Sequence, residues 1–352
     1  GAETTQEYTS DFVEPEYTSL TKDYEICLLW HQVFAQSDNA ELSSLLEEAR
    51  GVNTIAPTWF SLSDNEGGFT SLADTSYVET AHEMGLEVWG LIDNFSPDVS
   101  TYEVLSRTST RTALVENLTQ AALDCGLDGI NIDFESIKAD VGPHFVQFIR
   151  ELSILCRKNG IILSVDVPVP MDFSKYYNRE ELGNVCDYVI MMGYDEHWST
   201  SDAGSSASLP FVRSGIENTL LEVPQNKLIN GMPFYTRVWE FDASVQVPEG
   251  EDPLAAKYVL SSTAVGMDRA RTLLEEGGAQ LVLGLAHFRH GASLGGGTEE
   301  EETVELLGLF PHSYQGDSRG AEIFSRLGVH TEYTDKGVRL TLAGTPVDRL
   351  EE

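Results

Sequence analysis

The chain has 352 residues, of which 41% are hydrophobic and 22% are charged, so it is long and apolar enough for a large folded core. Its 57 acidic and 22 basic residues give a formal net charge of -35, which repels phosphate backbones and excludes nucleic acid as a favoured partner. No stretch approaches the roughly 20 apolar residues needed to cross a bilayer, so we expect no membrane insertion.

Short apolar runs alternate with helical stretches from residue 24 onward, after an acidic segment that we interpret as a linker over residues 1–22. The predicted strands cover residues 26–33, 52–60, 86–95, 129–134, 161–167, 188–194, 227–235 and 281–288. The predicted helices cover residues 40–50, 76–84, 110–125, 145–158, 209–221 and 267–276. Several of these helices stop at a glycine, as helix C-termini commonly do.

Strands that alternate with helices at this spacing predict a parallel sheet, and their near-continuous apolar character is typical of strands covered on both faces. Seven or eight such units favour a (β/α)8 TIM barrel over an open sheet. The turn at residues 31–34 carries no glycine fingerprint, which disfavours dinucleotide binding. We therefore expect a barrel over 23–310 and an irregular C-terminal segment over 311–352, with a β-hairpin at 331–342.

Neither the cysteines nor the histidines suggest a metal centre. The four cysteines are scattered without a CxxC pair, so buried free thiols are their expected state. Asp195, Glu196 and His197 are consecutive, and consecutive residues of a strand or loop rarely bind one ion. His82 and Glu83 lack the second histidine of a zinc protease motif. We expect no metal and no cofactor.

The segment from Asp128 to Glu135 is the most informative part of the chain. It reads Asp-Gly-Ile-Asn-Ile-Asp-Phe-Glu, and alternate residues of a strand share one face. Asn131, Asp133 and Glu135 are therefore expected to point into the barrel, while the apolar residues between them meet the helices. The C-terminal ends of barrel strands are where catalytic groups lie, so these three residues are candidates for chemistry.

Two neighbouring carboxyl groups cannot both ionise cheaply, so the pKa of one is raised and that group can serve as a general acid near neutral pH. Glu135 lies nearest the expected mouth and is the predicted acid, and Asp133 would share its proton and orient it. The other interpretation is a buried structural cluster. That interpretation requires a strong compensating network, because a buried carboxylate without partners is costly.

The same segment resembles the signature of family 18 glycoside hydrolases, the chitinase-like barrels, written D-G-x-D-x-D-x-E. It matches at Asp128, Gly129, Asp133 and Glu135. It departs at Asn131, where chitinases usually have Asp. This variant is similar to the branch of spore-cortex and peptidoglycan N-acetylglucosaminidases.

The resemblance implies substrate-assisted catalysis, in which the N-acetyl carbonyl of the substrate attacks the anomeric carbon. Glu135 would then protonate the leaving oxygen, and Asp133 would stabilise the positive nitrogen of the oxazolinium. The resemblance also implies that Tyr194 hydrogen-bonds the acetamide and that Asp195 supports the pocket.

Two further blocks, at residues 191–198 and 231–237, resemble the same branch. The predicted substrate-binding residues are Asn131, Asp195, Tyr235, Arg237, Trp59 and Trp198. For the tryptophans, packing in the barrel core is an equal alternative to stacking on sugar faces.

The C-terminal region departs from the family pattern, because relatives usually close the barrel with a strand that carries a tryptophan and residues 281–288 have none. We predict a bacterial glycosidase that cleaves β-linked N-acetylglucosamine in peptidoglycan, with spore-cortex fragments favoured, located outside the cell, in the wall or on the spore. One alternative is a chitinase acting on chitin-like oligosaccharides. The irregular C-terminus favours another, a sugar-binding barrel without catalysis, and a structural coat or wall protein is the weakest alternative.

Overall fold

The computed structural model describes residues 18–47, 49–242, 244–248 and 250–275, together with three strands between residues 302 and 342. The chain divides into two units. The first comprises Gly1–Asp195 and Ala207–Pro233, and the second comprises Glu196–Ser206 and Phe234–Glu352.

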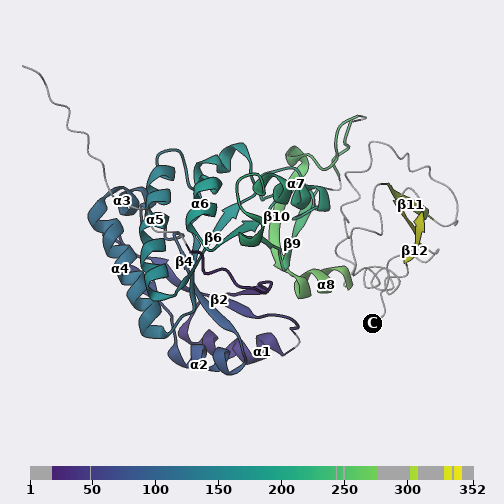
Figure 1. The fold of residues 1–352 in the computed structure, drawn as a ribbon. Coiled ribbons are helices and arrows are strands. Elements are labelled where there is room, and N and C mark those ends of the chain that lie inside the picture. The colour runs from purple at the N-terminus through teal and green to yellow at the C-terminus, as the bar shows by residue number, and fades with distance from the viewer. Residues whose placement is uncertain are drawn as a thin grey trace, which may run out of the picture. The chain divides into compact units, whose positions relative to one another are not determined.

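A parallel sheet with the strand order β1-β2-β4-β5-β6-β7-β8 forms the centre of the first unit (Figure 1). These strands are β1 (Leu28–His31), β2 (Thr54–Leu62), β4 (Glu87–Asp93), β5 (Gly129–Asp133), β6 (Ile162–Pro168), β7 (Tyr188–Met192) and β8 (Leu228–Gly231). The short β3 (Phe69–Ser71) pairs antiparallel with β2. Each parallel strand lies beside the next one along the chain, which is the winding of an α/β barrel.

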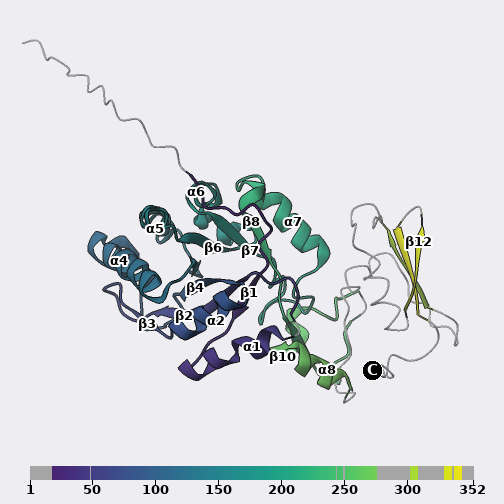
Figure 2. The same ribbon diagram turned by 60° about the horizontal axis from the view of Figure 1, so that its bottom comes forward.

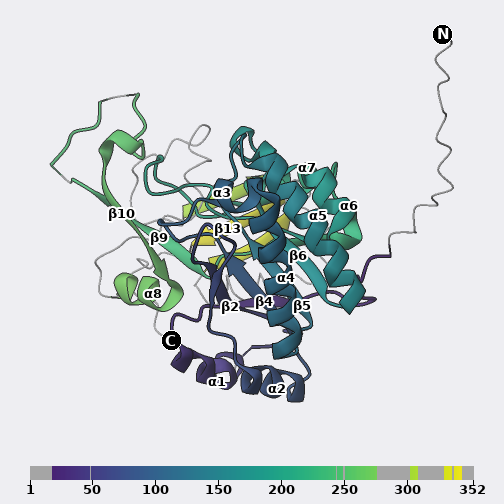
Figure 3. The same cartoon turned by 90° about the vertical axis from the view of Figure 1, so that its left-hand side faces the viewer.

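Helices connect these strands on the outside of the sheet. They are α1 (Leu42–Leu46), α2 (Thr75–Glu83), α3 (Thr101–Ser106), α4 (Thr108–Cys125), α5 (Gly142–Asn159), α6 (Arg179–Val185) and α7 (Leu209–Thr219). Figures 1 and 3 show α4, α5 and α6 side by side along the outer face. α1 is shorter than predicted, because the 3-10 helix η1 (Gln36–Glu41) forms much of that connection. α3 and α6 were not predicted.

The sheet curls strongly enough to bring distant strands into contact across its interior (Figure 2). Trp30 on β1 donates a hydrogen bond from Nε1 to Asn131 Oδ1 on β5 at 3.0 Å, although β2 and β4 lie between these strands. The ring of Trp30 also lies against Gly231 of β8, where an added Cβ would come within 3.0 Å of it. The fold is therefore the predicted TIM barrel. The predicted strand at 281–288 lies outside the described residues.

Aromatic rings fill the barrel interior near the N-terminal ends of the strands. Trp89 is fully buried and stacks on Tyr188, with ring centroids 5.4 Å apart. Gly129 begins β5 beside this ring, and a Cβ there would lie only 2.6 Å from a Trp89 ring atom. Packing therefore requires the glycine of the Asp128–Glu135 segment, and the polar residues that follow it lie beyond this aromatic layer.

The segment before β1 runs across the N-terminal ends of the strands. Asp187, buried just before β7, accepts hydrogen bonds from Leu20 N at 2.7 Å and Ser19 Oγ at 3.2 Å. Lys22 pairs with Glu87 at the start of β4. These residues were assigned to the linker from the sequence, so the contacts of the barrel begin a few residues earlier than predicted.

The second unit contains an antiparallel pair, β9 (Tyr235–Phe241) with β10 (Val259–Gly266), followed by α8 (Met267–Glu275). The strand predicted over 227–235 thus ends early, and its last residue begins β9. A separate antiparallel sheet has the order β11-β13-β12, from β11 (Glu302–Leu307), β12 (Val329–Thr334) and β13 (Gly337–Leu342). β12 and β13 pair antiparallel, with Thr334 opposite Gly337, over the residues of the predicted hairpin.

Two simpler expectations are also tested by the fold. Cys125, Cys156 and Cys186 are buried free thiols as expected, but Cys27 is exposed, which corrects the expectation for that residue. Among the described helices, none combines the length and the apolar character that a membrane span requires.

Candidate active site

The side chains at the end of β5 alternate between the helices and the barrel interior, as predicted. Phe134 packs outward, with its ring stacked on that of Phe148 of α5 at 5.6 Å. Asn131 points inward and is bonded to residues of β1 and β6. Asp133 and Glu135 follow on the same inner side. Their carboxyl groups are close enough that the charge of Glu135 raises the pKa of Asp133.

Asn131 is fully buried, and its amide group is occupied by the protein itself. Its Oδ1 accepts the hydrogen bond from Trp30, and its Nδ2 donates to Ser164 Oγ at 3.1 Å and to Asp166 Oδ1 at 2.9 Å. A side chain bonded in this way fixes β5 against its neighbours and organises the residues around it.

Asp133 is a half-buried carboxyl group with an unsatisfied oxygen. Its Oδ1 is buried and has no hydrogen-bond partner among the described residues. Desolvation, followed by the charges of Glu135 and Asp93, raises the pKa of Asp133 to about 7. A buried acceptor without a donor costs stability, so its presence at the end of a barrel strand points to a ligand that supplies the donor.

The backbone of Glu135 is held from two sides. Asn94, which follows β4, accepts from Glu135 N at 2.8 Å and donates to Glu135 O at 3.0 Å. Tyr177 is buried and donates from Oη to the carbonyl of Phe134 at 2.9 Å. Ser136 then takes a left-handed backbone conformation with φ of 57°, which is strained for serine. Neighbouring residues therefore fix the position of Glu135 firmly.

The carboxyl group of Glu135 is accessible to solvent at the rim, yet protein atoms surround it on several sides. This partial desolvation, followed by the charges of Asp195 and Asp93, raises the pKa of Glu135. A carboxyl group that keeps its proton to higher pH and remains accessible can donate that proton to a bound molecule.

Tyr194 and Asp195 follow β7 at the same end of the barrel. Tyr194 N donates to Met192 O at 2.8 Å, which turns the chain sharply after the strand. Asp195 has a φ of 56°, a left-handed conformation that aspartate tolerates better than most residues. Its carboxylate is exposed, and its charge acts on Glu135. The structure thus brings Asp195 near the predicted acid.

Trp59 lies in the core. Its side chain is 1% exposed, its ring meets Tyr77 of α2 edge-on at 5.0 Å, and its Nε1 donates to Asn39 Oδ1 at 2.7 Å. The register of β2 on β4 shifts between Thr58 and Phe60, so Trp59 occupies a bulge that accounts for its turn toward the helices. The predicted substrate contact of Trp59 is therefore corrected, and the packing alternative applies.

Three predicted substrate-binding residues belong to the second unit, namely Trp198, Tyr235 and Arg237. Trp198 is 49% exposed. Arg237 on β9 lies over the ring of Trp239 at 5.7 Å and donates to Ser262 Oγ at 3.3 Å. Its Nε is buried without a hydrogen-bond partner among the described residues. The carboxyl groups that act on one another are those of Asp93, Asp133, Glu135 and Asp195, and we call them the carboxyl cluster. All four belong to the first unit.

Four residues in or next to this cluster were not predicted from the sequence, namely Asp93, Asn94, Asp166 and Tyr177. Asp93 ends β4 and Asp166 lies near the end of β6, so the rule that selected Asp133 could have selected them as well. Asn94 and Tyr177 contact backbone atoms of the two residues after β5, from a loop and from the 3-10 helix η2 (Asp172–Tyr177), and no sequence pattern indicates such contacts.

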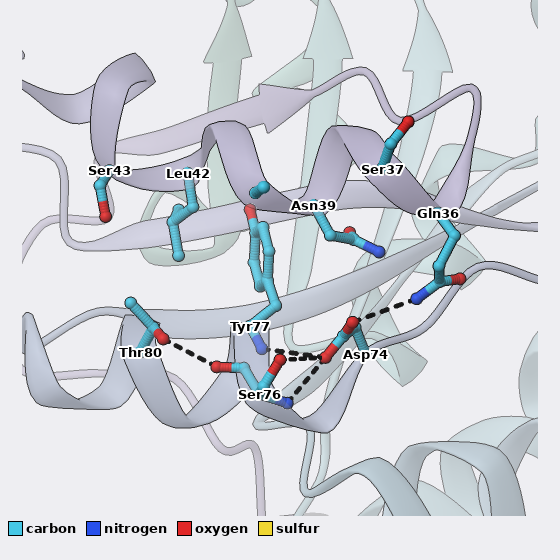
Figure 4. A pocket seen from close by; sticks show the side chains of 10 residues that line it. Gln36, Ser37, Asn39, Leu42, Ser43, Asp74, Ser76, Tyr77 and Thr80 are labelled. Carbon is cyan, nitrogen blue, oxygen red and sulfur yellow. Dashed lines mark hydrogen bonds between the residues drawn. The ribbon is translucent and has the colours of Figure 1, made fainter.

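A search of the described residues finds no group of three or more His, Cys, Asp or Glu side chains arranged to hold a metal ion. A polar cavity of about 310 Å³ lies elsewhere on the first unit, between η1, α1 and α2 (Figure 4). In its wall, Asp74 accepts hydrogen bonds from Ser76 N at 2.8 Å and from Gln36 Nε2 at 3.1 Å. None of the residues that line this cavity belongs to the carboxyl cluster.

A curled parallel sheet with a pair of carboxyl groups at the end of one strand is the arrangement of a barrel glycosidase. Residues 73–291 match the sequence profile of glycosyl hydrolases family 18. This match covers more than half of the chain, and the chain belongs to that family.

Similar proteins agree with this assignment. The chain is 26% identical over 219 residues to the uncharacterized glycosylase YvbX of Bacillus subtilis (strain 168), covering 59% of this chain and 63% of that protein. It is 23% identical over 181 residues to the cortical fragment-lytic enzyme of Bacillus anthracis, covering 50% and 40%. The chain thus spans less than two thirds of the length of these relatives.

The crystal structure of a chitinase from Chromobacterium violaceum ATCC 12472 superposes with a TM-score of 0.58 at 17% identity, covering 91% of this chain and 86% of that one. This likeness shows the fold. A different match is short: 52 residues are 65% identical to 3-phosphoshikimate 1-carboxyvinyltransferase of Bacteroides fragilis (strain YCH46), covering 15% of this chain and 13% of that protein.

Proposed function

We propose that the chain hydrolyses β-linked N-acetylglucosamine in peptidoglycan, with spore-cortex fragments as the favoured substrate, by substrate-assisted retaining catalysis. The observation that carries this proposal is the pair of carboxyl groups at the end of β5. Glu135 is accessible and its pKa is raised, while Asp133 presents a buried oxygen with no hydrogen-bond donor among the described residues. A substrate acetamide has an N–H group that supplies such a donor.

The proposed reaction divides the work between these two residues. Glu135 protonates the glycosidic oxygen as it leaves, and the acetamide carbonyl of the substrate attacks the anomeric carbon in place of a protein nucleophile. Asp133 accepts a hydrogen bond from the acetamide N–H and stabilises the positive charge of the oxazolinium. Glu135, now ionised, then takes a proton from the water that opens this intermediate, which returns the acid to its starting state.

Other residues support these steps. Tyr194 hydrogen-bonds the acetamide, and Asp195 keeps the proton on Glu135 through its negative charge. Asn131 supports the substrate site without contacting the substrate, because its amide group is already hydrogen-bonded to residues of β1 and β6. The second unit carries three further proposed substrate-binding residues, Trp198, Tyr235 and Arg237.

The names of the relatives support the choice of substrate and location. One relative is named for lysis of cortical fragments, which favours peptidoglycan and a spore- or wall-associated location outside the cell. The fold is shared with a chitinase, so a chitin-like oligosaccharide is the alternative substrate.

The test is hydrolysis of purified spore-cortex peptidoglycan and of chitooligosaccharides, with products identified by mass spectrometry. The chain should release fragments ending in N-acetylglucosamine from peptidoglycan, and Glu135→Gln should reduce the rate by about 10²–10⁴-fold, the usual contribution of a general acid. Glu116→Gln, on the exposed side of α4, is the matched control and should keep the full rate. Binding of both glycans without turnover would identify a sugar-binding barrel, and turnover of chitooligosaccharides alone would select the alternative substrate.

A further inference from the structure

Asp166 on β6 is a buried carboxyl group with no role in the reaction described above. It is 2% exposed, and its Oδ1 accepts the hydrogen bond from Asn131 Nδ2 at 2.9 Å. Asn131 stands where the family signature has an aspartate, so the carboxyl group next to this position comes from the neighbouring strand.

The register of the two strands places Asp166 beside Asp133. Ile132 pairs with Val165, so Asp133 and Asp166 are the next residues along adjacent parallel strands. Neighbouring strands lie about 4.8 Å apart, and side chains at matching positions point to the same face. Asn131 and Ser164, two residues earlier, already meet in the interior at 3.1 Å. The two carboxyl groups therefore both enter the barrel from adjacent strands.

Every titratable group that acts on this pair from the barrel strands carries negative charge when ionised. Asp93 acts on Asp133 from the end of β4, Glu135 acts from just after β5, and the charge of Asp195, after β7, reaches Glu135. In the described part of the barrel, no basic side chain forms an ion pair with Asp133 or Asp166. A second buried anion here would be very costly.

Burial, followed by the charge of Asp133, raises the pKa of Asp166 well above its usual range, which favours the protonated form of this carboxyl group. One oxygen of Asp166 already accepts from Asn131, which directs the proton to the other oxygen. A neutral carboxyl group on the strand beside that of Asp133 is then available as a hydrogen-bond donor.

We propose that Asp166 is a positioning residue for the reaction, which works in its neutral form by donating a hydrogen bond to ionised Asp133. Asn131 orients Asp166 for this task. The donated bond stabilises the anionic form of Asp133 that faces the oxazolinium nitrogen, and it fixes the direction of that carboxylate. This inference rests on the proposed function for its effect on catalysis, but the protonation of Asp166 is independent of it.

Two substitutions separate this role from simple packing. Asp166→Asn keeps a neutral donor and an acceptor at the same place, whereas Asp166→Leu keeps the approximate volume and removes both. The acid limb of the kcat profile should stay at the wild-type pH in Asp166→Asn and move up by about one pH unit in Asp166→Leu, because the anion of Asp133 loses its donor. KM should change less than kcat. An unshifted acid limb in folded Asp166→Leu, or equal shifts in both variants, would overturn the proposal.

An infrared difference spectrum between the wild type and Asp166→Asn at neutral pH tests the proton directly and requires neither activity nor the leucine variant. A protonated carboxyl band should be lost on substitution. Loss of a carboxylate band in its place would show that Asp166 is ionised and would refute the inference. If Glu135→Gln kept its hydrolytic rate while the protonated band was present, the proposed function would fail and the state of Asp166 would stand.

Discussion

The environment of Asp133 favours the reaction and lowers the stability of the folded chain. Its pKa is about 7 in the folded chain and about 3.9 in an unfolded one. A carboxyl group with a raised folded pKa contributes stability that is fully present below pH about 4 and is lost as the pH rises through about 7. At pH 7 and above, ionised Asp133 is therefore a destabilising group.

We expect Asp133→Asn to abolish hydrolysis and to stabilise the chain at neutral pH. One pKa unit corresponds to about 1.4 kcal/mol, and neighbouring carboxyl groups share the effect, so the expected gain at pH 8 relative to pH 4 is about 1–3 kcal/mol. Denaturant unfolding at both pH values measures it. Asp140→Asn, at an exposed carboxylate, is the control and should show no such difference. An equal effect of Asp133→Asn at both pH values would contradict the prediction.

Asn94 offers a second prediction at this scale, because it holds the peptide group of Glu135 by two hydrogen bonds. Asn94→Ala should lower kcat by about 100-fold, since a small misplacement of a catalytic group has an effect of this size. Asn94→Asp keeps the acceptor for Glu135 N but adds a negative charge. It should therefore raise the pKa of Glu135 and shift the basic limb of the rate profile upward. A pH profile for each variant distinguishes the two effects.

Site residues could be predicted from the sequence where they follow the two-residue alternation of a strand. Asp133 and Glu135 were identifiable because polar residues at alternate positions of an apolar strand are rare and share one face. Asn94 was not, because its contacts are with backbone atoms that every sequence has. Trp59 was misassigned because a bulge in β2 interrupts the alternation on which the prediction relied.

At the scale of elements, the strands of the barrel were predictable and some helices were not. Buried parallel strands form continuous apolar runs, and the glycines at 85, 126 and 160 mark helix ends by their positive φ. α6 has only seven residues and is preceded by Asn178, an N-cap residue with a left-handed backbone, so neither length nor periodicity reveals it. The break between β8 and β9 falls at Met232–Phe234, where Gly231 and Pro233 interrupt the predicted strand, and the prediction did not use this signal.

The segment over residues 18–24 is an element whose contribution can be measured. Asp187 joins it to the barrel by accepting from Leu20 N, and its other oxygen accepts from Leu163 N at 2.9 Å. Asp187→Asn replaces one acceptor by a donor and leaves a buried backbone N–H unpaired. The expected loss is about 2–3 kcal/mol in the free energy of unfolding.

Because Asp187 lies at the N-terminal ends of the strands, the rate of hydrolysis well below the melting temperature should not change. Ser19→Ala removes two longer bonds, to Asp187 at 3.2 Å and from Thr21 N at 3.3 Å, leaves the bond from Leu20 N to Asp187 in place, and should have a smaller effect on unfolding. A large loss of rate at full folding in Asp187→Asn would show that this end of the barrel is coupled to the site.

At the scale of the whole molecule, the family match and the strand pairing suggest where the barrel ends. The match to family 18 ends at residue 291, while β11, β12 and β13 pair only with one another among the described strands. The sequence predicts a division after residue 310, but β11 pairs with β13, so we propose a boundary before β11. The 52-residue match to 3-phosphoshikimate 1-carboxyvinyltransferase fits within the stretch after residue 291, and we propose that it lies there.

This boundary predicts the result of a deletion. A chain that ends at residue 294 keeps the predicted eighth strand and loses β11, β12 and β13 together. If those strands form a separate unit, the barrel should unfold at a temperature within a few degrees of the full chain, corresponding to less than about 1 kcal/mol, and should keep its rate on peptidoglycan. A chain that ends at residue 275 is the comparison, because it also lacks the predicted eighth strand and should lose both stability and activity. Equal damage from the two deletions would mean that residues after 294 are part of the barrel and would contradict the proposed boundary.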